Sequence, residues 1–225
     1  PLGFPWETSD PFLFCVHHDD AYPAGNERLG PAASLVGRNL GQDFELRDGW
    51  RMYHGEVVPG FPQHPHRGFE TVTYMLDGRM RHRDNKGNEG VLVPGSVQWM
   101  TAGRGIVHSE MPEQEQGRMR GFQLWVNLPA SEKMTAPRYQ EYGPDRFPET
   151  EVAPGVRVKV IAGQVAGVAG AIVQPATDPI YVDLALEAGA RFEQAVPAGH
   201  SAFAYVYEGA ARFGEAGATS DGAKG

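Results

Sequence analysis

The sequence predicts an all-β protein that contains two β-barrels in tandem. Turn-forming residues recur at short intervals from about residue 39 onward, and the runs between them have the length of β-strands. No segment in the first half of the chain keeps a helical period. The stretch 68–78 is echoed by the stretch 199–209, since both contain a strand-like run with a tyrosine at the same step and end in an acidic-Gly turn. Together these features indicate antiparallel sandwiches or barrels.

The expected strands are short runs rich in apolar, β-branched or aromatic residues. The first lies at 12–16 and contains Cys15, which we expect to be a buried small side chain. The run 71–74, Thr-Val-Thr-Tyr, is the most strongly β-prone part of the chain. A short helical turn is expected near residue 130. The other expected strands are 44–47, 50–58, 70–77, 79–83, 91–93, 96–100, 107–111, 120–127, 156–161, 169–174, 179–186, 190–194 and 202–207.

Two pairs of metal-capable side chains stand out in the first half of the chain. His64 and His66 lie two residues apart, and so do His108 and Glu110 behind a later glycine turn. Residues i and i+2 of a strand point to the same face, so two such strands facing each other would bring three imidazoles and a carboxylate to one cation. Glu70 shares the strand parity of His64 and His66. Spacing alone therefore leaves open whether Glu70 or Glu110 is the carboxylate ligand, with the other orienting an imidazole.

The donor set predicts a divalent transition metal ion. Three neutral imidazoles and one carboxylate leave two positions of an octahedral ion open for water, substrate or dioxygen. The single negative charge favours Fe(II) or Mn(II) in a site of net positive charge, and Zn, Ni and Cu are alternatives. The run 17–20 contains two histidines and two aspartates but is not expected to form a joint site, because adjacent residues point to opposite faces of a strand.

A change in composition divides the chain near residue 129. Between 129 and 148 several prolines interrupt the strand pattern, which indicates a linker. We therefore expect an N-terminal metal-binding barrel at 1–128 and a C-terminal barrel at 149–225. The second barrel is expected to be incomplete within these 225 residues, either cut short or completed by residues beyond them.

The echo also predicts that the second barrel lacks metal ligands. Its alignment places Ala195 and Pro197 where the first copy has His64 and His66, and Ser201 where it has Glu70. The second copy would then keep the barrel strand without its metal-binding side chains.

Composition excludes several classes of protein. Hydrophobic residues make up 41% of the chain and charged residues 21%, which is an ordinary globular balance. The formal net charge of -8 argues against direct nucleic-acid binding, and the basic run Arg79, Arg81 and Arg83 is expected to be a solvated face of a hairpin. A single cysteine excludes an intrachain disulfide and Cys-rich zinc sites. No apolar segment is long enough to span a membrane and no signal-peptide pattern is seen, so we expect a cytoplasmic protein.

Two long stretches, 64–72 and 98–112, resemble the signature stretches of the pirin family. Further similarity follows at 123–129 and 137–139. The resemblance implies a bicupin, in which two jelly-roll (cupin) barrels share one chain and only the N-terminal barrel holds a metal ion. It also implies that His64, His66, His108 and Glu110 are the metal ligands. Glu70 would then be a neighbour that orients one of them.

The resemblance further implies a function. Several pirins use non-haem Fe(II) for quercetin 2,3-dioxygenase activity, so we expect a small aromatic substrate, a flavonol, together with dioxygen. Glu110 would be the catalytic base that takes the proton of the flavonol hydroxyl. The alternative is an iron-dependent, redox-sensing regulator that binds a protein partner without turnover. A third possibility is a cupin isomerase or a binding protein for a small oxyanion. We expect a monomer.

The remaining expectations concern the walls of the substrate pocket. Phe61, Met75, Trp99 and Met100 are candidates for its apolar walls, although each of them also suits a packed core. Arg67 and Arg104 lie beside glycine turns and could orient an anionic substrate or form structural salt bridges.

Overall fold

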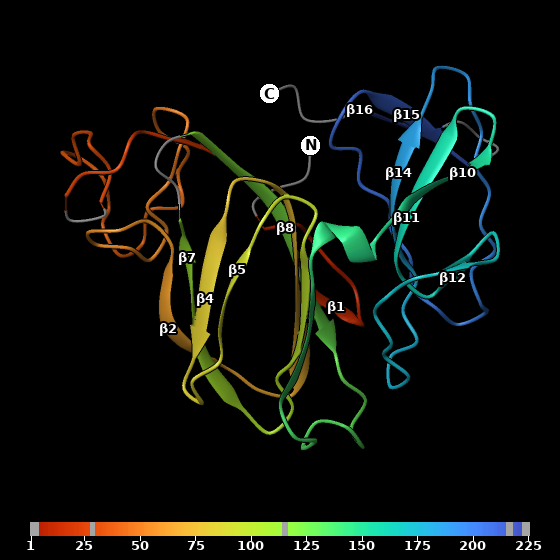
Figure 1. The fold of residues 1–225 in the computed structure, drawn as a ribbon, viewed down its shortest axis with the longest axis horizontal. Helices are drawn as coiled ribbons and strands as arrows, with labels where there is room; N and C mark the ends of the chain where they lie inside the picture. The colour runs from red at the N-terminus through yellow and green to blue at the C-terminus, as the bar shows by residue number, and fades with distance from the viewer. Residues whose placement is uncertain (1–4, 28–29, 114–116, 215–217, 222–225) are drawn as a thin grey trace. The chain divides into compact units, whose positions relative to one another are not determined.

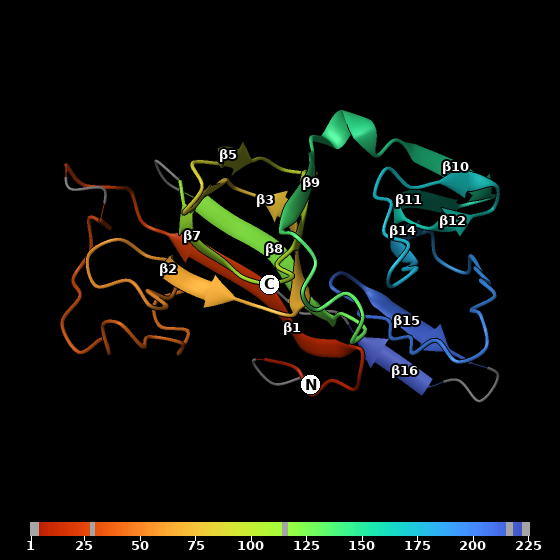
Figure 2. The same cartoon turned by 90° about the horizontal axis from the view of Figure 1, so that it is seen from below.

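Two antiparallel sheets form the first part of the protein, in a computed structural model that describes residues 5–27, 30–113, 117–214 and 218–221. In spatial order, the five-stranded sheet consists of β1 (Phe12–Tyr22), β8 (Gly117–Asn127), β3 (Phe69–Asp77), β6 (Val97–Thr101) and β9 (Arg138–Tyr142). The four-stranded sheet consists of β2 (Phe61–His66), β7 (Ile106–Pro112), β4 (Met80–Asp84) and β5 (Glu89–Leu92). These two sheets face each other in Figures 1 and 2, as the layers of a β-sandwich do. The all-β prediction is confirmed, and the described residues contain one helical element, the 3-10 turn η1 (Pro144–Arg146).

Strand β1 shows how alternation places polar side chains between the sheets. His18 and Asp20 are buried on the inner face of the strand. Their neighbours His17 and Asp19 lie on the other face, where Arg118 donates a 2.5 Å hydrogen bond from Nε to Asp19 Oδ1. The two histidines and two aspartates of this run are therefore divided between opposite faces, because side chains alternate along a strand.

Strand β3 lies in the middle of its sheet and is buried on both faces. On its outer face Val72 and Tyr74 join an apolar core with Ile161 and Ile172 from the second half of the chain. The Tyr74 hydroxyl donates a 2.7 Å hydrogen bond to Asp183 Oδ2. A strand covered on both sides is nearly continuous in its apolar character, which explains the strong β pattern of this segment.

The second half of the chain contains smaller sheets. A three-stranded sheet has the order β10 (Glu149–Ala153), β11 (Val156–Ala162) and β14 (Tyr181–Leu186), and β12 (Gln164–Val165) pairs with β13 (Val168–Ala169). Residues 193–225 form a compact unit separate from residues 1–192, and in it β15 (Ala210–Phe213) pairs with β16 (Ala218–Asp221). The division into domains at 128 and 148 stays a prediction. None of the helical structure in the described ranges is long and apolar enough to cross a membrane.

Several expected strands are absent from the described residues. The expected strands at 44–47 and 50–58 are wrong, because that segment forms only isolated bridges. Asp48 and Tyr53 have positive φ angles of 55° and 56°, and a left-handed residue interrupts the alternation that a strand requires. The expected strand at 169–174 is also wrong, because the short strand β13 ends at residue 169.

Other differences lie in the second half of the chain. Strand β9 falls inside the segment 129–148 that was expected to be a linker, and it pairs with β6. The runs 190–194 and 202–207 belong to no strand of the described residues. The alternation of side chains in a sequence predicts which face of a strand is buried. It does not predict whether a partner strand from another part of the chain is there to pair with it.

A buried ion pair stabilises the irregular segment before β2. Arg38 Nη1 donates a 2.9 Å hydrogen bond to Asp43 Oδ2, and both side chains are almost fully buried. The same guanidinium lies 3.5 Å from the ring centroid of Trp50 and donates to the backbone oxygens of Trp50 and Arg47. A buried charge with this many partners fixes the path of the chain although no strand forms there.

Two further sequence predictions are confirmed. Cys15 is buried, with 1% of its surface exposed. The basic run on β4 is a solvated face, where Arg81 and Arg83 pair with Glu89 and Arg81 also contacts Glu113.

Candidate metal centre

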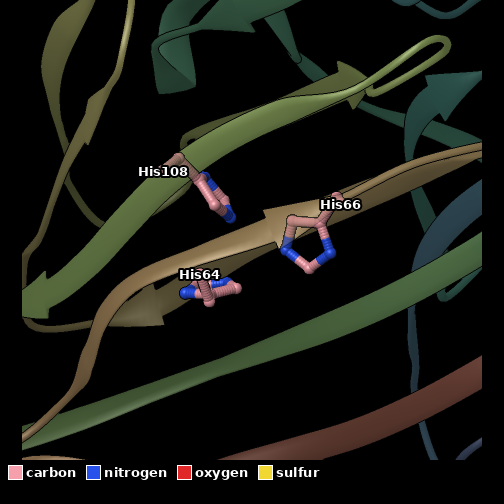
Figure 3. Close-up of side chains that lie close together, drawn as sticks. All are labelled: His64, His66 and His108. Atoms are coloured by element: carbon pink, nitrogen blue, oxygen red, sulfur yellow. The ribbon is translucent and has the colours of Figure 1, made fainter.

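Strands β2 and β7 bring three histidines together. The two strands are antiparallel and pair His64 directly with His108, while His66 follows His64 on the same strand. One ring nitrogen from each of the three histidines lies within 4.8 Å of the others. Figure 3 shows the three rings converging from the two strands. His66 and His108 are buried and His64 is half-buried, so the cluster sits at the edge of the protein interior.

The backbone around two glycines fixes the spacing of these strands. Gly68 has φ +77° and its amide donates a 2.8 Å hydrogen bond to the Gly103 carbonyl. Gly103 has φ +51°, and a Cβ at that position would lie 2.2 Å from the Thr135 carbonyl oxygen. Glycine is required at residue 103 because a side chain there would collide with this carbonyl. The turn that follows β2 and the turn that precedes β7 are therefore joined to each other by a backbone hydrogen bond.

The ring nitrogens of the three histidines suit metal binding. His64 Nδ1 lies 2.8 Å from the Pro62 carbonyl, and because a carbonyl only accepts, Nδ1 is the donor and Nε2 is the nitrogen left to face a metal ion. Burial lowers the pKa of His66 to about 3 and also lowers that of His108, so both rings are neutral at pH 7. His66 Nε2 and both ring nitrogens of His108 are buried and have no hydrogen-bond partner. Orphaned buried nitrogens are rare unless a ligand satisfies them, so these residues fit a metal ion.

Glu110 lies beside the three histidines, two residues after His108 on β7. Its Oε2 is 3.8 Å from His108 Nε2, and 2% of its surface is exposed. Thr73 Oγ1 donates to Oε1 at 3.2 Å and Gln123 Nε2 donates to Oε2 at 2.7 Å. Burial acts to raise the pKa of Glu110, but His108, His64 and the Gln123 hydrogen bond outweigh it and hold the pKa below its ordinary value. Thr73 and Gln123 therefore fix the position of the Glu110 carboxylate, which is ionised at neutral pH.

Glu70 does not reach the histidines. It is fully buried and accepts hydrogen bonds from Thr101 Oγ1 at 2.6 Å, from Gln174 Nε2 and from Thr177 Oγ1 at 3.3 Å. The expectation that Glu70 orients an imidazole is wrong. Strand β2 ends at residue 66 and β3 begins at residue 69, so the left-handed turn at Gly68 breaks the parity that the sequence argument assumed.

A small cavity between the sheets adjoins Glu110. Of the expected walls, Phe61 and Met75 line it. Trp99 packs instead in the outer core with Val72, and Met100 packs with Ala102 and Ile106. The full lining is His18, Phe61, Thr73, Met75, Met80, Glu110, Met119, Gly121, Phe122 and Gln123.

Sequence reasoning missed three polar side chains of this site. Thr73, Gln123 and His18 belong to the neighbouring strands β3, β8 and β1 of one sheet, and they lie near Glu110 because that sheet faces the sheet that contains β7, which local spacing does not predict. The expected role of Arg67 in orienting a substrate finds no support here, since Arg67 Nη2 lies 3.5 Å from Met134 Sδ at the surface and neither Arg67 nor Arg104 lines the cavity.

Comparisons with known proteins point to one family. The family model for Pirin matches residues 6–126. A pirin-like protein from Caulobacter vibrioides is 62% identical over 158 residues, which covers 70% of this chain and 57% of that protein. The chain spans about half the length of the curated relatives it matches.

Solved structures agree with these relatives. A crystal structure of a protein from Geobacillus kaustophilus superimposes with a TM-score of 0.71 at 31% identity, covering 95% of this chain and 70% of that one. A structure of quercetin 2,3-dioxygenase from Acinetobacter baumannii gives a TM-score of 0.58 at 28% identity, covering 78% of this chain and 48% of that one.

Proposed function

Because this chain belongs to the pirin family, we propose that it binds Fe(II) in its N-terminal cupin barrel and acts as a dioxygenase on flavonols such as quercetin. His64, His66 and His108 would hold the ion, and Glu110 would be the fourth ligand. Mn, Zn, Ni and Cu remain alternative ions for the same donors. The observation that carries the proposal is the convergence of three imidazoles, with nitrogens within 4.8 Å of one another, beside a buried carboxylate.

When bound, the metal ion would supply a Lewis-acidic centre for the substrate hydroxyl and for dioxygen. Glu110 would accept the proton of that hydroxyl on a carboxylate oxygen. Thr73 and Gln123 would keep this carboxylate in place while its charge changes, because each donates to a different oxygen.

Oxygen uptake with quercetin tests the proposal directly. Protein loaded anaerobically with Fe(II) is expected to consume dioxygen only when a flavonol is added, and His66→Ala should abolish the uptake. Glu70→Gln is the matched control, because it changes a carboxylate from the same signature stretch that bonds to Thr101 and Gln174 instead of the histidines. Iron-loaded wild-type protein that takes up no dioxygen with any flavonol would refute the enzyme. Redox-dependent binding of a partner protein in that case would favour the regulator.

Metal content tests the fourth ligand separately. Glu110→Gln is expected to lower the metal occupancy measured by elemental analysis, whereas Glu70→Gln should leave it unchanged. The reverse order would show that Glu110 is not a ligand.

A further inference from the structure

The small cavity between the sheets lies close to the three histidines. Glu110 lines it, and Glu110 Oε2 is 3.8 Å from His108 Nε2. Phe61 also lines it, and the centroid of the Phe61 ring is 6.5 Å from that of His64. A molecule in this cavity would therefore lie next to side chains that border the metal centre.

The size of the cavity limits what it can hold. Its free volume is about 20 Å³. A site needs roughly 10–15 Å³ of such volume to hold one water molecule, so this cavity has room for a single molecule of about that size. A flavonol is many times larger and would have to bind outside the cavity. Dioxygen, the other reactant of the proposed reaction, is small enough to enter.

Most of the wall is apolar, and methionines form a large part of it. Met75, Met80 and Met119 come from β3, β4 and β8 and have 2%, 5% and 1% of their surface exposed. Thioethers are polarizable and are only weak hydrogen-bond acceptors. An apolar molecule gains free energy on moving from water into such surroundings, whereas a buried water molecule needs two to four polar partners.

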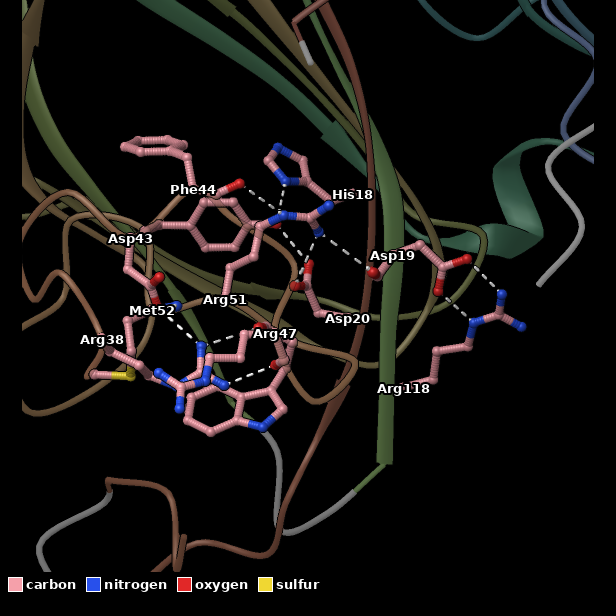
Figure 4. A network of polar contacts seen from close by, with 12 residues as sticks. His18, Asp19, Asp20, Arg38, Asp43, Phe44, Arg47, Arg51, Met52 and Arg118 are labelled. Atoms are coloured by element: carbon pink, nitrogen blue, oxygen red, sulfur yellow. Dashed lines mark hydrogen bonds and ion pairs between the residues drawn. The ribbon is translucent and has the colours of Figure 1, made fainter. Parts of the chain in front are cut away.

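The polar side chains of the wall are engaged with other residues. Thr73 and Gln123 donate to the two oxygens of Glu110, at 3.2 and 2.7 Å. His18 belongs to the polar network of Figure 4, in which its Nδ1 lies 2.8 Å from the Tyr53 hydroxyl. The wall thus favours a small apolar occupant over water.

We propose that this cavity holds dioxygen for the reaction at the metal centre. This inference rests on the proposed function, because it assigns a place to the second reactant of the same reaction. The flavonol and dioxygen would be held in separate places at the same time, so that their encounter does not depend on dioxygen arriving from bulk water. Met75, Met80 and Met119 would then determine the affinity for dioxygen.

Xenon binding tests the cavity without a metal ion, a flavonol or turnover. Xenon is apolar and polarizable, it enters dry apolar cavities, and its anomalous scattering locates it in a crystal. Wild-type crystals held under xenon pressure are expected to show one xenon atom between Met75, Met80 and Met119. Met119→Phe should abolish this peak, because the larger ring fills the space. An ordered water molecule in place of xenon, or no peak at all in the wild type, would overturn the inference.

Oxygen kinetics test the role in the reaction. With Fe(II)-loaded protein and saturating quercetin, Met119→Phe is expected to raise the KM for dioxygen about threefold or more, while the KM for quercetin and the metal content stay unchanged. Met100→Phe is the matched control, because Met100 is equally buried but packs with Ala102 and Ile106 outside the cavity, and it should leave the KM for dioxygen as in the wild type.

The two measurements separate this inference from the proposed function. A Met119→Phe variant that excludes xenon but keeps the wild-type KM for dioxygen would overturn the role assigned to the cavity, and so would equal effects of the two substitutions. Wild-type protein that binds xenon but takes up no dioxygen with any flavonol would refute the flavonol reaction and leave the cavity as a site for a small apolar gas.

Discussion

Glu70→Ala is expected to destabilise the protein strongly without affecting its metal site. The change removes a fully buried carboxylate that accepts hydrogen bonds from Thr101 at 2.6 Å and from Gln174, with a longer contact of 3.3 Å from Thr177. A hydrogen bond to a charged group contributes about 1.5–3 kcal/mol, and buried donors that lose their partner add to the loss. Counting the two short bonds, we expect the free energy of unfolding to fall by about 3–5 kcal/mol, a large part of the ~5–15 kcal/mol that stabilises a typical domain.

Urea denaturation followed by circular dichroism measures this loss, and elemental analysis measures metal content on the same samples. Glu70→Gln is the control, because its amide oxygen still accepts a hydrogen bond, so a smaller loss of about 1–2 kcal/mol is expected. Both variants should bind as much metal as the wild type while folded, since Glu70 contacts none of the imidazoles. A loss of stability below about 1 kcal/mol for Glu70→Ala, or a folded variant depleted of metal, would refute the reasoning.

Three further predictions concern other parts of the structure. Burial lowers the pKa of His18 to about 3, against an ordinary value near 6.5, so between these pH values the unfolded state binds a proton that the folded state does not. The stability that the neutral His18 ring contributes is therefore complete above pH 6.5 and falls by up to ~1.4 kcal/mol per pH unit as the pH drops toward 3. Urea titrations at pH 7, 6 and 5 should show a smaller decline for His18→Phe, and an unchanged decline would contradict this. Arg38→Met should lower the unfolding free energy by about 3–5 kcal/mol in the same assay, because Asp43 is left buried without its cation; a loss under about 1 kcal/mol would count against the ion pair. Gly103→Ala should cost at least about 1–3 kcal/mol and reduce metal occupancy, because its φ of +51° is strained for alanine and the Cβ meets the Thr135 carbonyl; wild-type metal content with wild-type stability would contradict this.

The sequence was sufficient for features that depend on neighbouring residues. His64 and His66 share a face because two residues separate them on one strand, and the same rule links His108 with Glu110. The argument failed for Glu70 because it carried strand parity across residues 67 and 68, where Gly68 adopts a left-handed conformation.

The sequence could not predict which residues strand pairing brings together. His18 lines the cavity because β1 pairs with β8, and this ladder places His18 opposite Gly121, a residue 121 − 18 = 103 positions further along the chain. Spacing along the chain carries no information about such a register. The segment around Tyr53 was misread for a related reason, since its alternating residues are anchored by Asp20 and by the Arg38–Asp43 pair rather than by a neighbouring strand.

The bond between the Gly68 amide and the Gly103 carbonyl has a consequence for how the ion enters. It ties the two histidine-bearing strands to each other through the backbone, without help from the side chains that would hold the ion. These strands would therefore hold the three imidazoles at a short separation whether or not an ion is bound, so binding would require dehydration of the cation but little ordering of the polypeptide. Deuterium exchange at the Gly68 amide should consequently be slow before loading and only slightly slower after it.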